Sequence, residues 1–313
     1  MNRPGKRIEK LRKTSQIFKK PSVTCEEEYG YMQPVIEKAK TTSKTSKLQS
    51  NKVILCAIAK LENNYIGEWV THYKSLGVDK IVLFDNNSVN GENLLSVKEV
   101  EDGVNDGWIV VKDAKGKRKY QCDAYSMCYS EYSGDYGWFM FFDVDEFLIL
   151  EKHKDVHDFL NQDKFQNFDS ILVSWKVYND NNLLCVSDGN YSVLTRFTTP
   201  SSNNGINKQS KCIIRGGLGK ITFLNPHNPT AKLSCCDANG RRKILARARS
   251  TEVVHSGAWL NHYTTKTVQE FIECKIARGG GGNTGMARGT RDYFYSINKR
   301  TPEKDKYFDR AKK

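Results

Sequence analysis

Short apolar runs alternate with amphipathic stretches through the first part of the chain after residue 50. The run VILCAIA at 53–59 is continuously apolar and short, which is typical of a strand buried on both faces of a sheet. A helical pattern follows from Tyr65 to Leu76, with apolar residues at three- and four-residue spacings, and Gly77 ends it. Further strands are predicted at 80–84, 108–111 and 138–142, and a second helix is predicted at 119–132. This alternation predicts an α/β fold with a mostly parallel sheet.

Two of the predicted strands are followed directly by an acidic residue. Asp85 follows KIVLF, and Asp143 follows WFMFF. Ligands of open α/β sheets bind beyond the carboxyl ends of the strands, so both acids are expected at the ligand-binding edge. The segment 139–150 also contains Asp145 and Glu146 but no Lys, Arg or His, and an unpaired buried carboxylate costs several kcal/mol. Either the strand ends at Phe142 and the acids stand at its mouth, or a cation arrives to meet them. The position of both acids directly after strands favours the first, with the acids facing a cleft.

The spacing Asp-Val-Asp at 143–145 places two carboxylates at a turn that leaves a strand. Such a pair can bind Mg²⁺ or Mn²⁺ through oxygen atoms and leave coordination positions for phosphate oxygens. The ion then neutralises a diphosphate leaving group. The same pattern also occurs as a simple turn with capping acids, but its place after a five-residue apolar strand favours the metal.

Composition narrows the class of protein. The chain has 313 residues, of which 38% are hydrophobic and 11% aromatic, enough for a large core and too many for a disordered chain. Its nine cysteines include no C-x-x-C pair, as expected for free thiols in a reducing compartment. Neither a secretory signal nor an apolar stretch of about 18 residues is found. We therefore expect a cytoplasmic protein.

The net charge of +13 is concentrated at the two ends of the chain. Residues 1–50 carry a net charge of +7 and residues 286–313 a net charge of +5, which leaves about +1 for the rest. We expect a loosely ordered basic arm at 1–50 and a basic tail at 286–313. This distribution disfavours a nucleic-acid-binding protein, the alternative that the charge and the aromatic residues raise. It suits peripheral docking to an anionic membrane surface, at the inner face of the cell membrane.

Five segments occur in the order found in a known family. They are KLENNYIGEWVTHYKSLGVDKIVLFDNNS (60–88), WFMFFDVDEF (138–147), VSWKVYND (173–180), KCIIR (211–215) and HYTTKTVQEFIECKIARG (262–279). Together they resemble the nucleotide-sugar glycosyltransferases of glycosyltransferase family 92 and its bacterial relatives in the family-2 group, over most of residues 52–282. The resemblance implies a glycosyltransferase-A fold at 51–285, with a Rossmann-like nucleotide-binding half of mostly parallel sheet joined to an acceptor-binding half. It also implies Mn²⁺ or Mg²⁺ and a UDP-sugar donor.

The resemblance assigns roles to individual positions. Asp143 and Asp145 match the DxD acids, with Asp145 as the direct metal ligand and Asp143 nearest the ribose and the metal. Asp85 and Asn86 match an acid–amide pair in which the acid would meet the uracil or ribose. The other donor-binding positions that it implies are Glu62, Gln121 and Tyr125.

Three positions depart from the family pattern. Leu61 stands where the family has Asn before Glu62, Phe84 replaces a Tyr, and Asn90 replaces the second acid of a Ser-x-Asp motif. These departures bear on donor affinity and not on the fold.

A histidine from late in the domain is expected to complete the metal site. His227, in FLNPHNP, and His262, in NHYTTK, both match family positions. We favour His227, because His262 can instead orient Lys266 or the diphosphate. His255 is a third candidate, but a histidine within a strand is more simply structural.

The segment 266–283 is predicted to open as a helix, and it contains four consecutive glycines. Lys266, Lys275 and Arg278 are expected to face the diphosphate, since basic side chains suit phosphates. The glycine run is a candidate lid over the site and matches no P-loop pattern.

The resemblance favours an inverting reaction, which needs a carboxylate base about 3 Å from the acceptor hydroxyl. Asp180 and Asp188 lie in the expected acceptor region, whereas a retaining enzyme would need no such base. We expect sugar transfer to a glycan or lipid-linked acceptor in bacterial lipopolysaccharide or capsule synthesis. A metal-dependent nucleotidyltransferase or hydrolase using the same acidic pair is an alternative, and it predicts nucleotide turnover without sugar transfer.

Overall fold

The computed structural model describes residues 50–203, 205–243, 252–278 and 289–311, all of which belong to one compact unit. Its helices are α1 (Asn63–Ser75), α2 (Lys98–Asn105), α3 (Gln121–Tyr132), α4 (Val156–Leu160), α5 (Val193–Arg196), α6 (Val268–Glu270), the π-helix η4 (Phe271–Ile276), α7 (Arg291–Ile297) and α8 (Pro302–Arg310). Its strands are β1 (Val53–Ala59), β2 (Lys80–Asp85), β3 (Ile109–Asp113), β4 (Trp138–Phe141), β5 (Glu146–Leu150), β6 (Ser170–Val177), β7 (Ser210–Arg215), β8 (Phe223–Asn225), β9 (Asn228–Pro229), β10 (Cys235–Asp237), β11 (Arg242–Lys243) and β12 (Ala258–His262).

A ten-stranded sheet forms the centre of the described fold. Its first half runs β3-β2-β1-β4, and every pair in this half is parallel. The sheet continues through β7, which is antiparallel to both β4 and β6, and β6 in turn pairs in parallel with β10 and β12. The α/β class with a mostly parallel central sheet is therefore confirmed, with antiparallel pairs confined to the second half and its edges.

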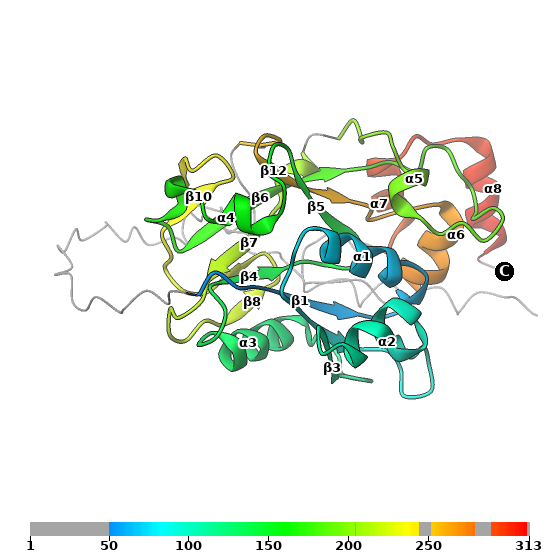
Figure 1. Ribbon diagram of the computed structural model, residues 1–313. Coiled ribbons are helices and arrows are strands. Elements are labelled where there is room, and N and C mark those ends of the chain that lie inside the picture. The colour runs from blue at the N-terminus through cyan, green and yellow to red at the C-terminus, as the bar shows by residue number, and fades with distance from the viewer. Residues whose placement is uncertain (1–49, 204, 244–251, 279–288, 312–313) are drawn as a thin grey trace, which may run out of the picture. The chain divides into compact units, whose positions relative to one another are not determined.

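Strand β1 shows why this sheet is buried on both faces. Side chains of a strand alternate between its two faces, and Val53 and Leu55 pack in the same core as Trp69 of α1. Ile54 and Cys56 lie in a separate core on the other face, whose helix is α3. Figure 1 shows α1 and α3 on opposite sides of the strands. Each fully buried apolar side chain contributes about 1.5–3 kcal/mol, so a continuous apolar run is what this position requires.

Helix α1 is the element that the sequence pattern predicts most closely. Its buried residues include Tyr65, Trp69 and Tyr73, which are among those of the predicted apolar stripe. Gly77 follows with a φ of 77°, a left-handed conformation that a residue with a side chain adopts only with strain. The chain then enters β2.

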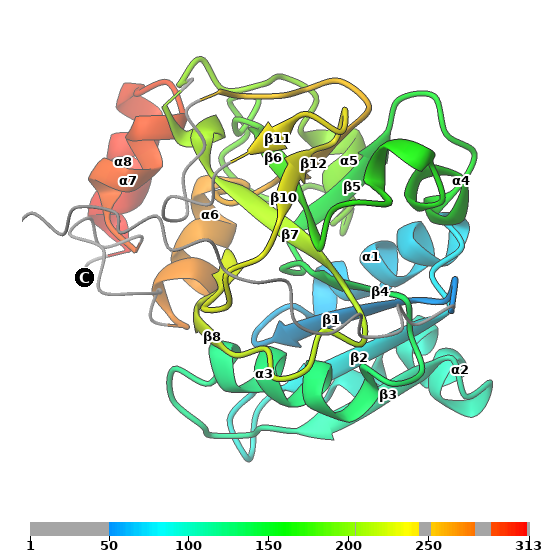
Figure 2. The same cartoon turned by 90° about the vertical axis from the view of Figure 1, so that its left-hand side faces the viewer.

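The C-terminal segment differs from the expected basic tail. Residues 291–297 and 302–310 form α7 and α8, and Phe294 and Phe308 are buried in the same core as β1 and α1. Figure 2 shows α6, α7 and α8 gathered beside one another. Two features of the sequence indicate these helices but do not enter a charge count. They are the aromatic residues between the charged ones and Thr301-Pro302, a typical helix start.

Residues 1–49, which include nearly all of the expected N-terminal arm, lie outside the described part. No described helix combines the length and the apolar character needed to span a bilayer.

Candidate active site

Polar residues stand at the carboxyl ends of the parallel strands, as expected. Glu62 follows β1, Asp85 is the last residue of β2, and Asp143 comes two residues after the end of β4. The strand stops before the acids, and Phe142 between them is fully buried. The local structure therefore brings these carboxylates to one edge of the sheet.

The carboxylate of Asp143 is fixed by three donors at one oxygen. Its Oδ1 accepts hydrogen bonds from Nε2 of Gln121 at 2.6 Å, from the hydroxyl of Tyr125 at 3.1 Å and from Nζ of Lys211 at 2.9 Å. Gln121 and Tyr125 lie one turn apart on α3, which explains why both reach the same atom. The Asp143 side chain remains 29% exposed, so part of the carboxylate is accessible.

Lys211 is the buried partner that the sequence analysis missed. It is the second residue of β7, is fully buried, and lies 2.9 Å from Asp143 and 3.5 Å from Glu146. Burial favours the neutral amine, but the two carboxylates outweigh it and raise the pKa of Lys211 above its ordinary value. Burial raises the pKa of Glu146 well above the usual range. A lone lysine in the apolar run SKCIIR was the available signal.

Asp145 is buried, and a histidine and two basic side chains lie beside its carboxylate. Its Oδ1 lies 3.4 Å from Nε2 of His262, and its Oδ2 lies 3.4 Å from Nζ of Lys275 and 3.9 Å from Arg278. Burial favours protonation of this carboxyl, but Lys275 and His262 outweigh it and hold the pKa of Asp145 well below its usual value. Basic side chains from distant segments thus supply positive charge beside this acid.

Glu62 forms a second ion cluster beside the first. It is paired with Arg278, and its Oε2 lies 3.7 Å from Nζ of Lys266. Lys266 has a φ of 55°, and its ammonium lies 4.1 Å from the centre of the Tyr65 ring. Because Arg278 contacts both acids, it links Glu62 to Asp145. All three basic residues expected to face a diphosphate are thus brought to this edge.

The loop after β2 is held by its own side chains. Asp85 accepts from the Asn87 side chain at 2.9 Å, and the Asn86 amide donates to the carbonyls of Ala114 and Lys117 at 2.7 and 2.8 Å. Asn87 in turn accepts from the backbone N–H of Leu61 at 2.9 Å and so connects the ends of β1 and β2. In this structure Asn86 and Asn87 therefore hold the loop in position.

Leu61 stands where the family has Asn, and its φ is 55°. Asparagine enters this left-handed region more readily than leucine, for which the conformation costs on the order of 1 kcal/mol. The departure therefore falls at a strained turn next to Glu62.

The three histidine candidates occupy different positions. His262 faces Asp145, and burial lowers its pKa so that the neutral imidazole is favoured. The rings of His227 and His262 both contact Trp175, with ring centres 5.2 and 4.1 Å away. His227 directs Nδ1 to the carbonyl of Ser210 at 3.0 Å, and His255 contacts the carbonyl of Trp175 at 2.7 Å. Of the two metal candidates, the structure brings His262 to the acid, because β12 ends beside Asp145, and the preference for His227 stays a prediction.

The donor set at Asp145 fits a divalent ion with two protein ligands. Within the described ranges, no group of three or more His, Cys, Asp or Glu side chains is close enough to hold a metal ion. Asp145 and His262 still offer an oxygen and a nitrogen atom 3.4 Å apart. Mg²⁺ is commonly held by one or two protein ligands together with substrate phosphates and water. Asp143 is less available, since three donors share its Oδ1.

The two expected bases have other surroundings. Asp180 is buried, and its Oδ2 lies 2.5 Å from Nζ of Lys304, so its charge is used to bind α8. This ion pair argues against Asp180 as the base, and Lys304 had been counted only as part of a basic tail. Asp188 is exposed in a turn with a φ of 52°. The glycine run at 279–282 lies outside the described residues.

Comparison with known proteins identifies the family. The sequence model of glycosyltransferase family 92 matches residues 52–275. The chain belongs to glycosyltransferase family 92. The expected resemblance to family 92 is thus confirmed.

Curated members of family 92 are similar to this chain over part of their length. A family 92 protein of Ricinus communis is 29% identical over 229 residues, which cover 70% of this chain and 36% of that protein. A family 92 protein of Arabidopsis thaliana is 26% identical over 192 residues, or 58% of this chain and 32% of that protein. The chain therefore spans about a third of the length of these relatives. The crystal structure of S. aureus TarS residues 1–349 aligns with 83% of this chain and 78% of its own, at a TM-score of 0.36 and 11% identity.

Proposed function

We propose that this chain transfers a sugar from a nucleoside-diphosphate donor, a UDP-sugar, to a hydroxyl group of a glycan or lipid-linked acceptor. The reaction is metal-dependent and inverts the anomeric centre. The observation that carries the proposal is the cluster around Asp145 in a family 92 chain. There a carboxylate and His262 face each other, and basic side chains surround them at the carboxyl edge of the sheet.

The basic side chains suit a diphosphate. Lys275 and Arg278 both lie against the Oδ2 of Asp145, and Lys266 lies beside Glu62. Ammonium and guanidinium groups make strong charge-assisted hydrogen bonds to phosphate oxygens. An incoming diphosphate can take over contacts that these cations now make to the two acids.

Asp145 and His262 are the side chains that would hold Mn²⁺ or Mg²⁺. Such an ion neutralises negative charge that develops on the departing diphosphate. Asp143, oriented by Gln121 and Tyr125, would hold the donor through its accessible part, beside the ribose. Of the two expected bases, Asp188 is retained as the candidate, because its carboxylate is exposed.

The cellular setting is proposed from charge. Exposed cations remain on the described part of the second basic end, at Lys299, Arg300, Lys306 and Arg310. They support docking to the anionic inner face of a cell membrane, where each nearby cation contributes about 1 kcal/mol. A lipid-linked acceptor of bacterial lipopolysaccharide or capsule synthesis would be presented at that surface to a cytoplasmic enzyme.

Calorimetric titration of UDP with and without Mn²⁺ tests the donor site. We expect binding that requires Mn²⁺ and that weakens at least about tenfold in Asp145→Ala, since a charged ligand is lost. Asp106→Ala removes an exposed aspartate after α2 and serves as the matched control, with unchanged binding. UDP binding that is absent, or indifferent to both Mn²⁺ and Asp145, would overturn the donor assignment. Product analysis with UDP-sugars then distinguishes transfer from the nucleotide turnover of a hydrolase.

A further inference from the structure

Cations of the chain itself already lie against the carboxylate of Asp145. Its Oδ2 is 3.4 Å from Nζ of Lys275 in η4 and 3.9 Å from Arg278, two residues after that helix. Arg278 also pairs with Glu62, whose other oxygen lies 3.7 Å from Nζ of Lys266. Three cationic side chains thus meet two carboxylates, and this small cluster has an excess of positive charge.

The cluster is largely shielded from water. The side chain of Asp145 is 5% exposed, that of Lys275 13% and that of Arg278 19%. The ammonium of Lys275 also donates to the hydroxyl of Thr264 at 3.1 Å, two residues after His262. Solvent and salt screen charges weakly in such surroundings. A divalent ion entering between Asp145 and His262 without an anion would therefore be repelled by both cations.

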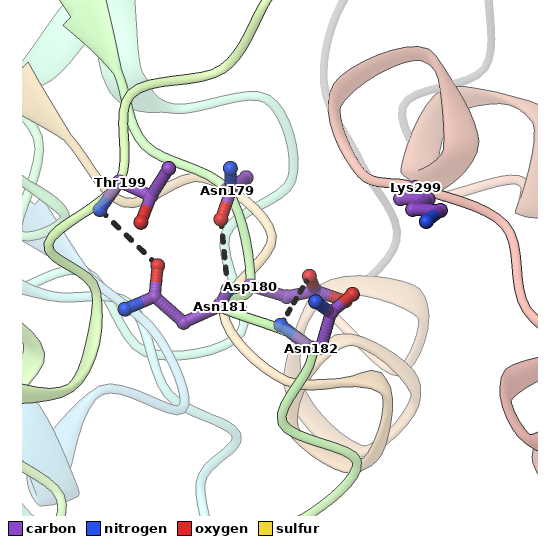
Figure 3. A pocket seen from close by; sticks show the side chains of 6 residues that line it. All are labelled: Asn179, Asp180, Asn181, Asn182, Thr199 and Lys299. Carbon is purple, nitrogen blue, oxygen red and sulfur yellow. Dashed lines mark hydrogen bonds between the residues drawn. The ribbon is translucent and has the colours of Figure 1, made fainter.

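A closed ion pair elsewhere in the fold shows how these contacts differ. Asp180 lies 2.5 Å from Nζ of Lys304 and also accepts from the N–H of Asn182 at 3.0 Å (Figure 3). Charge-assisted N–H···O bonds are typically about 2.7–2.9 Å long. At 3.4 and 3.9 Å, the two cations beside Asp145 are held at longer range. They can therefore exchange this acid for another anion at a smaller loss than Lys304 would suffer.

An irregular helix places Lys275 in the cluster. Residues Phe271–Ile276 form the π-helix η4 directly after the short helix α6. A side chain in a π-register points in a different direction from the axis than it would in an α-register, so this irregular turn sets the position of the ammonium. π-helices are rare and are frequent at functional sites. The irregularity supports a use for Lys275 beyond packing.

We propose that Lys275 and Arg278 act as internal counter-ions that hold Asp145 until a diphosphate draws them away, an inference that rests on the proposed donor site. The free chain therefore disfavours a divalent ion at Asp145 and His262. A diphosphate removes this barrier, because its oxygens bind the ammonium and guanidinium groups and release the carboxylate. Metal and nucleotide then bind together, and each raises the affinity for the other by the same factor.

Titration of the full chain with Mn²⁺ alone, followed by the electron paramagnetic resonance signal of the free ion, tests the inference. Lys275→Met removes one counter-ion, and we expect Mn²⁺ to bind at least about tenfold more tightly, within the usual range of coupling between sites. Lys275→Arg keeps the charge and should resemble the wild type. Lys306→Met, at an exposed position on α8, is the control and should also leave the affinity unchanged.

UDP should respond to the same variant in the opposite direction. In saturating Mn²⁺, Lys275→Met is expected to bind UDP less tightly, because a phosphate contact is lost. General loosening of the site does not raise one affinity and lower the other. The gain in Mn²⁺ affinity should disappear in the double variant Asp145→Ala/Lys275→Met, which lacks the guarded acid. Arg278→Met removes the other cation and should act in the same direction, which keeps the inference testable if Lys275→Met does not fold.

The outcomes separate this inference from the donor proposal. If UDP binding requires Mn²⁺ but the wild type and Lys275→Met bind Mn²⁺ alone equally well, the counter-ion inference fails alone. If Lys275→Met gains Mn²⁺ affinity through Asp145 but the wild type binds no UDP, the donor proposal fails and the guarding of Asp145 stands. An equal gain in Lys275→Arg would show that side-chain size and not charge keeps the ion out, and would overturn the inference.

Discussion

At the scale of single residues, Lys211 projects from β7 to the carboxylates of Asp143 and Glu146 and has no exposed surface. Two buried acids near one another repel, and each loses hydration on folding. The lysine offsets both effects, and the two acids in turn raise its pKa above the ordinary value despite burial. The acidic site is consequently stable only with this cation in place or with another that replaces it.

Lys211→Met is therefore expected to destabilise the protein by about 3–5 kcal/mol, the cost of leaving a buried ion pair half-removed. Urea unfolding at neutral pH measures the change in free energy. Lys176→Met, at a half-buried position on β6, is the control and should change stability by much less. A small effect of Lys211→Met would mean that the charge of Asp143 does not depend on Lys211 in the folded state.

The two buried histidines make a second prediction at this scale. We expect His262→Ala to weaken Mn²⁺-dependent UDP binding by about tenfold or more, the range seen when support of a metal site is removed. His227→Ala should weaken that affinity less, because Asp145 faces His262 and the Nδ1 of His227 is directed to the carbonyl of Ser210. Calorimetric titration of UDP with Mn²⁺ into both variants decides which histidine supports the metal site. The reverse result would restore His227 as the metal ligand.

These residues also show what the sequence alone could predict. Asp143 and Asp145 were identifiable because carboxylates directly after an apolar strand are costly unless they have a ligand-binding use. Lys211 was not, and the two candidate histidines could not be ranked, because the pairing of β7 with β4 and of β12 with β6 decides which side chains meet the acids. That pairing depends on contacts between distant segments, which local patterns do not encode.

At the scale of elements, a buried ion pair joins α5 to α6. Arg196 donates to both oxygens of Glu270 at 2.7 and 2.9 Å. Glu270 also accepts from Tyr65 of α1 at 2.9 Å and from Thr267, whose capping box starts α6. Burial favours protonated Glu270, but the bonds from Arg196 and Thr267 outweigh it and lower the pKa of the carboxyl. Three elements are thus held by one charged carboxylate.

This depressed pKa predicts acid sensitivity. At neutral pH the pair contributes fully, and as pH falls below about 4.5, the ordinary value for glutamate, the unfolded chain takes up the proton first and stability is lost. Glu270→Gln should cost about 3–5 kcal/mol at pH 7 by leaving Arg196 buried and unpaired, and should reduce the loss in acid. Urea unfolding at several pH values measures both effects. Glu273→Gln, an exposed change in the following π-helix, should show neither.

The strands and α1 could be predicted because their periodicity reflects burial that the sheet imposes on every residue. Helices α7 and α8 could not, because a mean charge over residues 286–313 averages out Phe294 and Phe308, the side chains that bind these helices to the core. The helix predicted to open the segment 266–283 is divided into the short helix α6 and the π-helix η4, because local pattern does not distinguish hydrogen-bond registers.

At the scale of the whole described unit, the C-terminal helices complete the wall of the acceptor region. Lys304 of α8 is buried and reaches Asp180 at 2.5 Å, the carbonyl of Lys299 at 2.8 Å and Asn182 at 3.3 Å. The loop after β6 and the last helix are therefore mutually dependent. The negative charge of this carboxylate compensates the buried ammonium of Lys304. The carboxylate is therefore poorly placed to remove a proton from a substrate.

A double-mutant cycle on Asp180 and Lys304 tests that dependence. Asp180→Asn and Lys304→Met are each expected to destabilise the protein by about 3 kcal/mol or more, because each leaves a buried charge unpaired. The double variant should be less destabilised than the sum, with a coupling energy of about 0.5–3 kcal/mol in urea unfolding. Lys306→Met, exposed on the same helix, is the control for helix propensity. If Asp180 were the catalytic base, sugar transfer would instead be abolished in Asp180→Asn and retained in folded Lys304→Met, a split that an ion pair of purely structural use does not produce.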